Sequence, residues 1–160
     1  MTTPSEILTD LPGITLRALT VADAPAYHAL LAGNRRHLTQ HGDYQDETAK
    51  PLVTVRADLA RPDDLRFGIY RDGTLIGRID LIAADPPRYS LGYWLAACHT
   101  GHGYATAAGR AVIDHAARIG ATDVYAGVTP GNTKSAAVLE RIGMTAVVEF
   151  DTYTRYHRAL

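Results

Sequence analysis

The chain has 160 residues, of which 46% are apolar and 21% are charged, and its formal net charge is −1. This composition is typical of one globular domain with a packed core and excludes a fibrous or wholly disordered chain, so we expect a single domain over residues 1–160. A nearly neutral chain lacks the basic excess that attracts nucleic acids and acidic membranes, so we expect neither partner, and an anion site would have to be local.

The N-terminal part predicts one strand and two helices. Met1 to Asp10 carries neither a basic leader nor an apolar signal core. Alternating apolar and polar residues predict a strand over Ile14–Leu19, and Thr20 to Asp23 can cap a helix that runs to about Leu31 and is ended by Gly33. The polar segment 34–45 reads as a loop or short helix, and Thr48–Leu59 as an amphipathic helix.

The rest of the chain alternates strand and helix patterns. In chain order these are strands at Leu65–Tyr70, Leu75–Ile82 and Tyr89–Leu95, a helix over Tyr104–Ile119, a strand at Asp123–Val128, a helix from Asn132 or Thr133 to Arg141, and strands at Ala146–Phe150 and Thr152–Arg158. Asp72-Gly73 predicts a tight turn, and Gly120 and Gly143 predict helix ends. The fold class is therefore mixed α/β (α+β), with helices packed on a largely antiparallel sheet that contains one strand-helix-strand unit.

The stretch Tyr89 to Gly109 contains no Lys, Arg, Asp or Glu and is long enough to span a bilayer. Its centre, residues 98–103, is polar and rich in glycine, which would leave backbone groups unpaired in lipid, so we reject a membrane span. Cys98 is the single cysteine, so no disulfide can form within the chain. Together with the absence of a leader, this favours a reducing cytoplasm.

The segment from Gly92 to Thr106 reads as a strand, a glycine-bearing loop and the start of a helix. Helix N-termini present unpaired N–H groups and a partial positive charge, while Gly101 and Gly103 allow close backbone approach. The pattern predicts a main-chain cradle for a pyrophosphate, although an isolated Gly-x-Gly is by itself also an ordinary turn.

The same segment resembles the acyl-CoA-binding motif Gln/Arg-x-x-Gly-x-Gly/Ala of the GCN5-related N-acetyltransferase (GNAT) family, with Thr100 at its first position. Gly-Tyr-Trp-Leu at 92–95 and Ala-Thr at 105–106 resemble the RimJ/RimL-like branch. A second block, Asn132-Thr133-Lys134-Ser135 followed by 138–144, resembles the Asn-x-x-Ser, helix and Gly-Phe of that branch. The resemblance covers essentially the whole chain.

The resemblance implies the GNAT fold, in which a mixed, mostly antiparallel sheet of six to seven strands has helices on both faces and a V-shaped splay between its central strands. It implies an N-acyltransferase that moves an acyl group, most often acetyl, from acyl-CoA to a primary amine of a small molecule or protein N-terminus by direct attack in a ternary complex. It places the donor on Trp94, Leu95, Ala97, Thr100, Gly101, His102, Gly103, Tyr104, Ala105, Thr106, Asn132 and Lys134. The pantetheine amides would pair with Leu95 and Ala97 like an added strand, and the Leu95 backbone would donate to the developing oxyanion.

For catalysis, the resemblance makes Ser135 the group that protonates the departing thiolate and Asn132 the group that orients donor or substrate, although both also suit an ordinary helix start. Two positions depart from the family. Leu139 stands where many relatives have a tyrosine acid, and Ser90 stands where many have a glutamate, so the general base is unassigned. The candidates Asp80, Tyr93, His28, His37 and His41 can act directly or through water, or serve only as surface or hydrogen-bonded residues.

The acceptor site is assigned by position to the segment from Arg35 to Tyr44, which can equally be a solvated loop. The substrate-binding candidates are His37, His41, Tyr44, Asp80, Ser90 and Tyr93. Arg110 and Lys134 can neutralise donor phosphates or be solvated. Trp94, Tyr93 and Tyr125 are expected to be core or cleft wall, since a platform for nucleic-acid bases would need a basic patch.

We expect no metal. His99 and His102 lie near Cys98 but lack further ligands at zinc spacing, and a lone cysteine usually serves packing. Two alternatives to an acyl-CoA enzyme stay open: an acyltransferase that takes its acyl group from the phosphopantetheine of an acyl carrier protein, and a non-catalytic CoA-binding module. The oligomeric state is also open, with a homodimer among the options.

Overall fold

A computed structural model describes residues 6–160, so residues 1–5 of the segment predicted to hold no leader lie outside the described part. The strands are β1 (Ile7–Leu8), β2 (Ile14–Ala18), β3 (Arg66–Arg71), β4 (Thr74–Asp85), β5 (Arg88–Leu95), β6 (Asp123–Val128), β7 (Thr145–Glu149) and β8 (Thr154–Ala159). The helices are α1 (Ala24–Gly33), α2 (Arg35–Leu38), α3 (Gln45–Ala49), α4 (Leu52–Ala60), α5 (Tyr104–Arg118) and α6 (Thr133–Arg141), with 3-10 turns η1 (Val21–Asp23) and η2 (Ala97–His99). None of these helices is long and apolar enough to cross a membrane.

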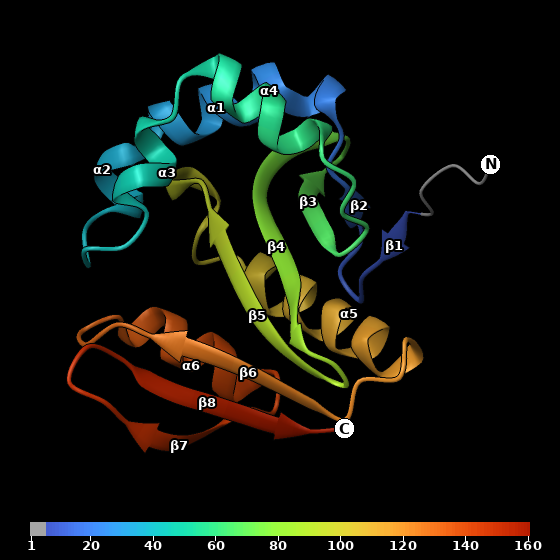
Figure 1. The fold of residues 1–160 in the computed structure, drawn as a ribbon, viewed down its shortest axis with the longest axis vertical. Helices are drawn as coiled ribbons and strands as arrows, with labels where there is room; N and C mark the ends of the chain where they lie inside the picture. The colour runs from blue at the N-terminus through green and yellow to red at the C-terminus, as the bar shows by residue number, and fades with distance from the viewer. Residues whose placement is uncertain (1–5) are drawn as a thin grey trace.

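The described strands form one sheet in the order β1-β2-β3-β4-β5-β6-β8-β7 (Figure 1). Every neighbouring pair among them is antiparallel except β5 and β6, which are parallel and joined through α5. The predicted mixed, mostly antiparallel sheet is therefore confirmed. The expected count of six to seven strands is wrong by one, because Ile7–Leu8 pairs with β2 and is too short to show an alternating pattern.

The two central strands splay. β5 and β6 pair only between residues 88–90 and 123–125. Beyond this short register the two strands no longer pair with each other, although β5 stays paired with β4 up to Leu95 and β6 stays paired with β8 up to Val128. Figure 1 shows their free ends diverging into an open V, which confirms the predicted splay.

The sheet separates two hydrophobic cores. The larger core packs α5 against the sheet and includes Leu91 and Leu95 of β5. The smaller core lies under α1 and α4, on the opposite face, and includes Trp94. Because successive strand residues face opposite sides of a sheet, β5 presents Tyr93 and Leu95 to the α5 face and Gly92 and Trp94 to the α1 face. The open end of β5 thus connects both layers.

One predicted helix, Thr48–Leu59, is two helices in the structure. Lys50 adopts an extended conformation with φ −63° and ψ 131°, and Pro51 becomes the residue before α4. Proline has no N–H to donate and disfavours helical backbone in the residue before it, so the chain must break there. The apolar positions of the prediction, Leu52, Val55 and Leu59, all lie in α4, so the helix pattern is genuine but begins only after Pro51.

The predicted turns and caps agree with the structure. Asp72 and Gly73 have φ of 48° and 83°, and Gly120 and Gly143, which follow α5 and α6, have φ of 92° and 89°. The side chain of Asn132 accepts a hydrogen bond from the Ser135 N–H at 3.2 Å and so caps α6. These local features set the ends of the elements that surround the splay.

Candidate active site

The V between β5 and β6 forms a cleft of about 1150 Å³. Its walls come from β5, the loop into α5, the first turns of α5 and α6, and the end of β6, while α2 and the segment after it form the rim. The predicted site residues on these walls are His37, His41, Tyr44, Tyr93, Trp94, Leu95, Thr100, Gly101, His102, Gly103, Tyr104, Ala105, Thr106, Asn132, Lys134 and Ser135. Ala97, Asp80 and Ser90, together with the base candidate His28, are not part of the wall.

The loop before α5 has the geometry of an anion cradle. Gly101 and Gly103 have φ of 79° and 81°, conformations that side chains with a Cβ rarely adopt. The first main-chain bond of α5 runs from the Ala107 N–H to the Gly103 carbonyl at 3.0 Å. The N–H groups of residues 104–106 precede this bond and have no acceptor within the helix. They face a cleft that can bring them an anion.

Three basic side chains line the cleft near this cradle. His102 and Lys134 line the cleft together with Arg110, which pairs with Asp10 at 3.4 Å. Burial, with the charge of Arg71 adding to it, lowers the pKa of His99, so this ring is neutral at pH 7. In the part of the chain that the structure describes, no three His, Cys, Asp or Glu side chains gather in a way that could hold a metal ion.

The main chain of Ala97 already has partners. Its N–H donates to the side-chain oxygen of Asn34 at 2.9 Å, and its carbonyl accepts from the hydroxyl of Thr100 at 2.9 Å. Pairing with pantetheine would have to replace one of these bonds. Because Ala97 also lies off the cleft wall, Leu95 is the better placed of the two strand-like contacts.

A tyrosine hydroxyl meets Ser135 across the splay. The Tyr93 hydroxyl on β5 and Ser135 Oγ on α6 lie 3.0 Å apart. Burial raises the pKa of Tyr93, an effect that the bond to Ser135 partly offsets, so the phenol is protonated at neutral pH. Leu139, at the position of the usual tyrosine acid, is 1% exposed and packs in the core.

This pairing was missed in the sequence analysis, which placed Tyr93 among the substrate contacts. The two residues are 42 positions apart, and neither local spacing nor periodicity links them. The signal that was present is the alternation of β5, which puts Tyr93 on the same face as α5 and α6.

The rim segment is tied to both arms of the V. The Tyr44 hydroxyl donates to the Tyr93 carbonyl at 2.8 Å, and the Thr129 hydroxyl donates to Asp43 at 2.6 Å. Tyr44 has φ 60°, an unusual conformation for a bulky residue, and this turn carries its ring into the cleft. Burial, with the charge of Lys134 adding to it, lowers the pKa of His37 on the same rim, so its imidazole is neutral.

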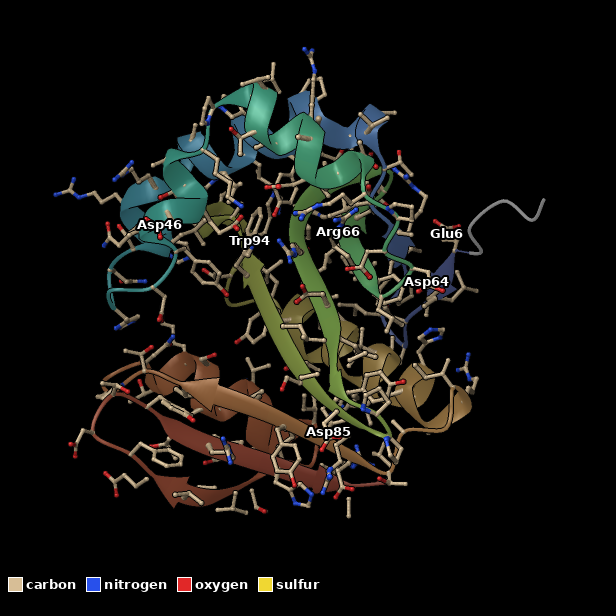
Figure 2. All side chains as sticks on the ribbon, in the orientation of Figure 1. Glu6, Asp46, Asp64, Arg66, Asp85 and Trp94 are labelled. Atoms are coloured by element: carbon tan, nitrogen blue, oxygen red, sulfur yellow. The ribbon has the colours of Figure 1, made fainter. Side chains whose placement is uncertain are left out.

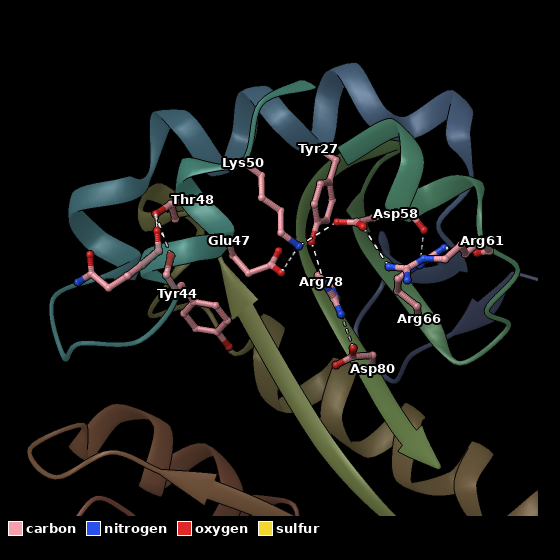
Figure 3. Close-up of polar contacts among 11 residues, drawn as sticks. Tyr27, Tyr44, Glu47, Thr48, Lys50, Asp58, Arg61, Arg66, Arg78 and Asp80 are labelled. Carbon is pink, nitrogen blue, oxygen red and sulfur yellow. Dashed lines mark hydrogen bonds and ion pairs between the residues drawn. The ribbon is translucent and has the colours of Figure 1, made fainter. Parts of the chain in front are cut away.

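Asp80 and Ser90 lie on the α1 face of the sheet rather than on the cleft wall. Ser90 is opposite Tyr125 at the last paired position of β5 and β6, the closed end of the V. Asp80 is buried and accepts a hydrogen bond from Arg78, which also donates to the Tyr27 hydroxyl at 2.9 Å (Figure 3). Figure 2 shows Trp94, which faces the same side of the sheet, near the end of β5.

Comparison with known proteins agrees with this geometry. The family model for the acetyltransferase (GNAT) domain matches residues 14–145. The Bacillus subtilis (strain 168) protein named "Probable N-acetyltransferase YjcK" is 32% identical over 143 residues, which cover 81% of this chain and 79% of that protein.

Solved structures share the fold. RimL, titled a ribosomal L7/L12 alpha-N-protein acetyltransferase in complex with coenzyme A, has a TM-score of 0.84 at 20% identity, with 98% of each chain covered. RimJ from Mycobacterium smegmatis, in complex with CoA-disulfide, has a TM-score of 0.78 at 24% identity and covers 98% of this chain and 88% of its own. The family model and the YjcK relative, with the splayed sheet and the glycine cradle, show that this chain belongs to the GNAT acetyltransferase family.

Proposed function

We propose that this protein is an N-acetyltransferase that moves the acetyl group of acetyl-CoA to a primary amine of a small molecule or protein N-terminus. One observation carries the proposal: a single cleft joins the free N–H groups at the start of α5 to the Tyr93–Ser135 pair. A donor with a phosphate at one end and a thioester at the other needs an anion site for the phosphate and a proton donor for the thioester, joined by one groove.

The donor is held mainly by main chain. The pyrophosphate binds at the N-terminus of α5, where Gly101 and Gly103 let it approach the backbone. The pantetheine arm enters the V along β5, where unpaired strand edges offer hydrogen bonds, and Leu95 is the contact nearest the thioester. Asn132 fixes the first turn of α6 and so the place of Ser135.

The reaction is direct acyl transfer. The amine nitrogen forms a bond to the thioester carbon, the carbon–sulfur bond breaks, and the thiolate needs a proton. Ser135 donates its hydrogen to the sulfur, and the Tyr93 hydroxyl replaces that hydrogen through their shared bond. The nitrogen loses a proton as the amide forms, and the Tyr93 phenolate regains one through water. A phenol is a stronger acid than an aliphatic hydroxyl, so Tyr93 is the better proton source of the two even though burial raises its pKa.

A thiol-release assay with acetyl-CoA and a panel of primary amines tests the proposal, with mass spectrometry to identify the acetylated product. We expect release that depends on the amine. If the protein binds acetyl-CoA and releases no thiol with any amine, it is a non-catalytic CoA-binding module instead. Release from an acetylated acyl carrier protein, with none from acetyl-CoA, would establish the carrier-protein donor.

Three finer expectations stay predictions: the identity of the acceptor, a homodimer, and a place in the cytoplasm. For the acceptor, the location of His37, His41 and Tyr44 at the rim supports the expectation that it enters the cleft past these side chains. The name of RimL refers to a protein N-terminus as substrate, which makes short peptides a reasonable first panel.

A further inference from the structure

One buried carboxylate faces the splay from the side opposite α5. Asp80 on β4 lies directly across from Gly92 on β5, and it is 9% exposed. Among residues 6–160, Arg78 is the hydrogen-bond donor to this carboxylate, through Oδ2. Its second oxygen, Oδ1, has no protein donor in the same part of the chain.

The free oxygen points at the gap that Gly92 leaves. A Cβ at Gly92 would lie 3.3 Å from Asp80 Oδ1, and no other atom would lie within 4 Å of it. Gly92 lines the cleft and Asp80 does not, so Oδ1 lies next to a wall residue that has no side chain to cover it. In Figure 3 the Asp80 carboxylate points toward β5, and the hydroxyl end of Tyr44 approaches the same strand from its other side.

The surroundings hold this carboxylate in place. Arg78 donates hydrogen bonds to both Asp80 and the hydroxyl of Tyr27, a buried residue of α1. Burial raises the pKa of Tyr44, and the negative charges of Asp43 and Asp80 raise it further, so the field of Asp80 reaches the rim of the cleft. The carboxylate is therefore fixed in position through Oδ2, and Oδ1 stays available beside the cleft wall at Gly92.

We propose that Asp80 is the acceptor-binding residue of this site: its Oδ1 holds the ammonium group of a cationic primary amine beside Gly92. The inference rests on the proposed acetyltransferase function and names the acceptor class, an amine that is positively charged in solution. The ammonium first gives one proton to Asp80, which passes it to water, and the neutral amine nitrogen then bonds to the thioester carbon. The nitrogen of that intermediate is far more acidic and loses its second proton by the same route, while the sulfur takes its proton from Ser135.

The test compares two acceptors in the wild type and in Asp80→Asn. The probes are 4-phenylbutylamine, which is cationic at pH 7.5, and aniline, which is neutral there. A hydrogen bond to a charged group is worth enough that kcat/KM for 4-phenylbutylamine should fall roughly 10- to 100-fold, while that for aniline changes less than about threefold. Acetyl-CoA affinity, measured by calorimetry, should stay within about threefold, because Asp80 lies on the α1 face of the sheet, opposite the face that carries α5 and its anion cradle.

Asp80→Asn leaves Arg78 without its anion and can therefore destabilise the fold. A second variant tests the same contact without breaking this ion pair. Gly92→Ala keeps the ion pair and places a methyl group against Oδ1. We expect the same selective loss for 4-phenylbutylamine. Equal losses for both acceptors, or no loss for 4-phenylbutylamine, would overturn the role of Asp80 while leaving the acetyltransferase intact. Absence of turnover with every amine in the wild type would overturn the proposed function, and this inference with it.

Discussion

Replacing Ser135 with alanine separates the chemical role of this residue from its structural one. The hydroxyl makes one hydrogen bond, to Tyr93 at 3.0 Å, and its loss should cost about 1 kcal/mol of unfolding free energy. The cap of α6 survives, because Asn132 accepts from the main-chain N–H of residue 135. The fold should therefore be nearly unchanged.

The effect on turnover should be much larger. A positioned proton donor contributes about 10²- to 10⁴-fold to rate, which corresponds to about 2.7 to 5.4 kcal/mol of activation free energy. We expect kcat to fall at least 100-fold in the thiol-release assay, while the acetyl-CoA dissociation constant from calorimetry stays within about threefold. Ser135→Thr, which keeps a hydroxyl on the same carbon, is the matched control and should retain most of the turnover. Equal kcat in wild type and Ser135→Ala would remove Ser135 from the mechanism.

The remaining predictions concern the proton source, the cradle and pH. Tyr93→Phe should lower kcat about tenfold, less than Ser135→Ala does, because the relay loses its proton source but keeps the serine hydroxyl that faces the sulfur. Unchanged turnover would exclude Tyr93 from the mechanism. Gly103→Val should weaken acetyl-CoA binding at least about tenfold in calorimetry. A φ of 81° strains a branched side chain by about 1 to 3 kcal/mol, which disfavours the loop conformation that presents the N–H groups; wild-type affinity would refute the cradle. Lys50 lowers the pKa of Asp58 below its unfolded value, so the pair stabilises the fold above about pH 4 and loses this effect as pH falls through the folded pKa. Asp58→Asn should thus cost up to about 1 kcal/mol at pH 7 and nothing at pH 2.5 in urea unfolding; a cost that is the same at both pH values would contradict the pairing.

Local chemistry made most of the donor side predictable from sequence. The glycines at 101 and 103, the cap at Asn132 and the turn at Asp72-Gly73 each act within a few residues, and each has the expected conformation. The family resemblance supplied the splay, which no propensity or periodicity contains. These features define the donor cleft because its walls are the ends of regular elements.

The acceptor side was far less predictable, because it is built from contacts between distant segments. The bond of Tyr93 to Ser135, that of Asp43 to Thr129 and the carboxylate at Asp80 beside Gly92 depend on which strands become neighbours. Asp80 was one candidate among several, and what distinguishes it is the glycine opposite, which appears only with the register of β4 and β5. The helix break at Pro51 was missed for another reason. The proline is a local signal in the sequence, but the apolar pattern that follows it outweighed it in the prediction.

The most direct test of donor binding in this cleft is calorimetric titration with acetyl-CoA and, in parallel, with acetyl-pantetheine, which lacks the pyrophosphate. If the N–H groups at the start of α5 form the anion cradle, acetyl-CoA binds and acetyl-pantetheine binds much more weakly. Equal affinities for the two ligands, or no binding of acetyl-CoA, would contradict the assignment of the cleft as an acetyl-CoA site.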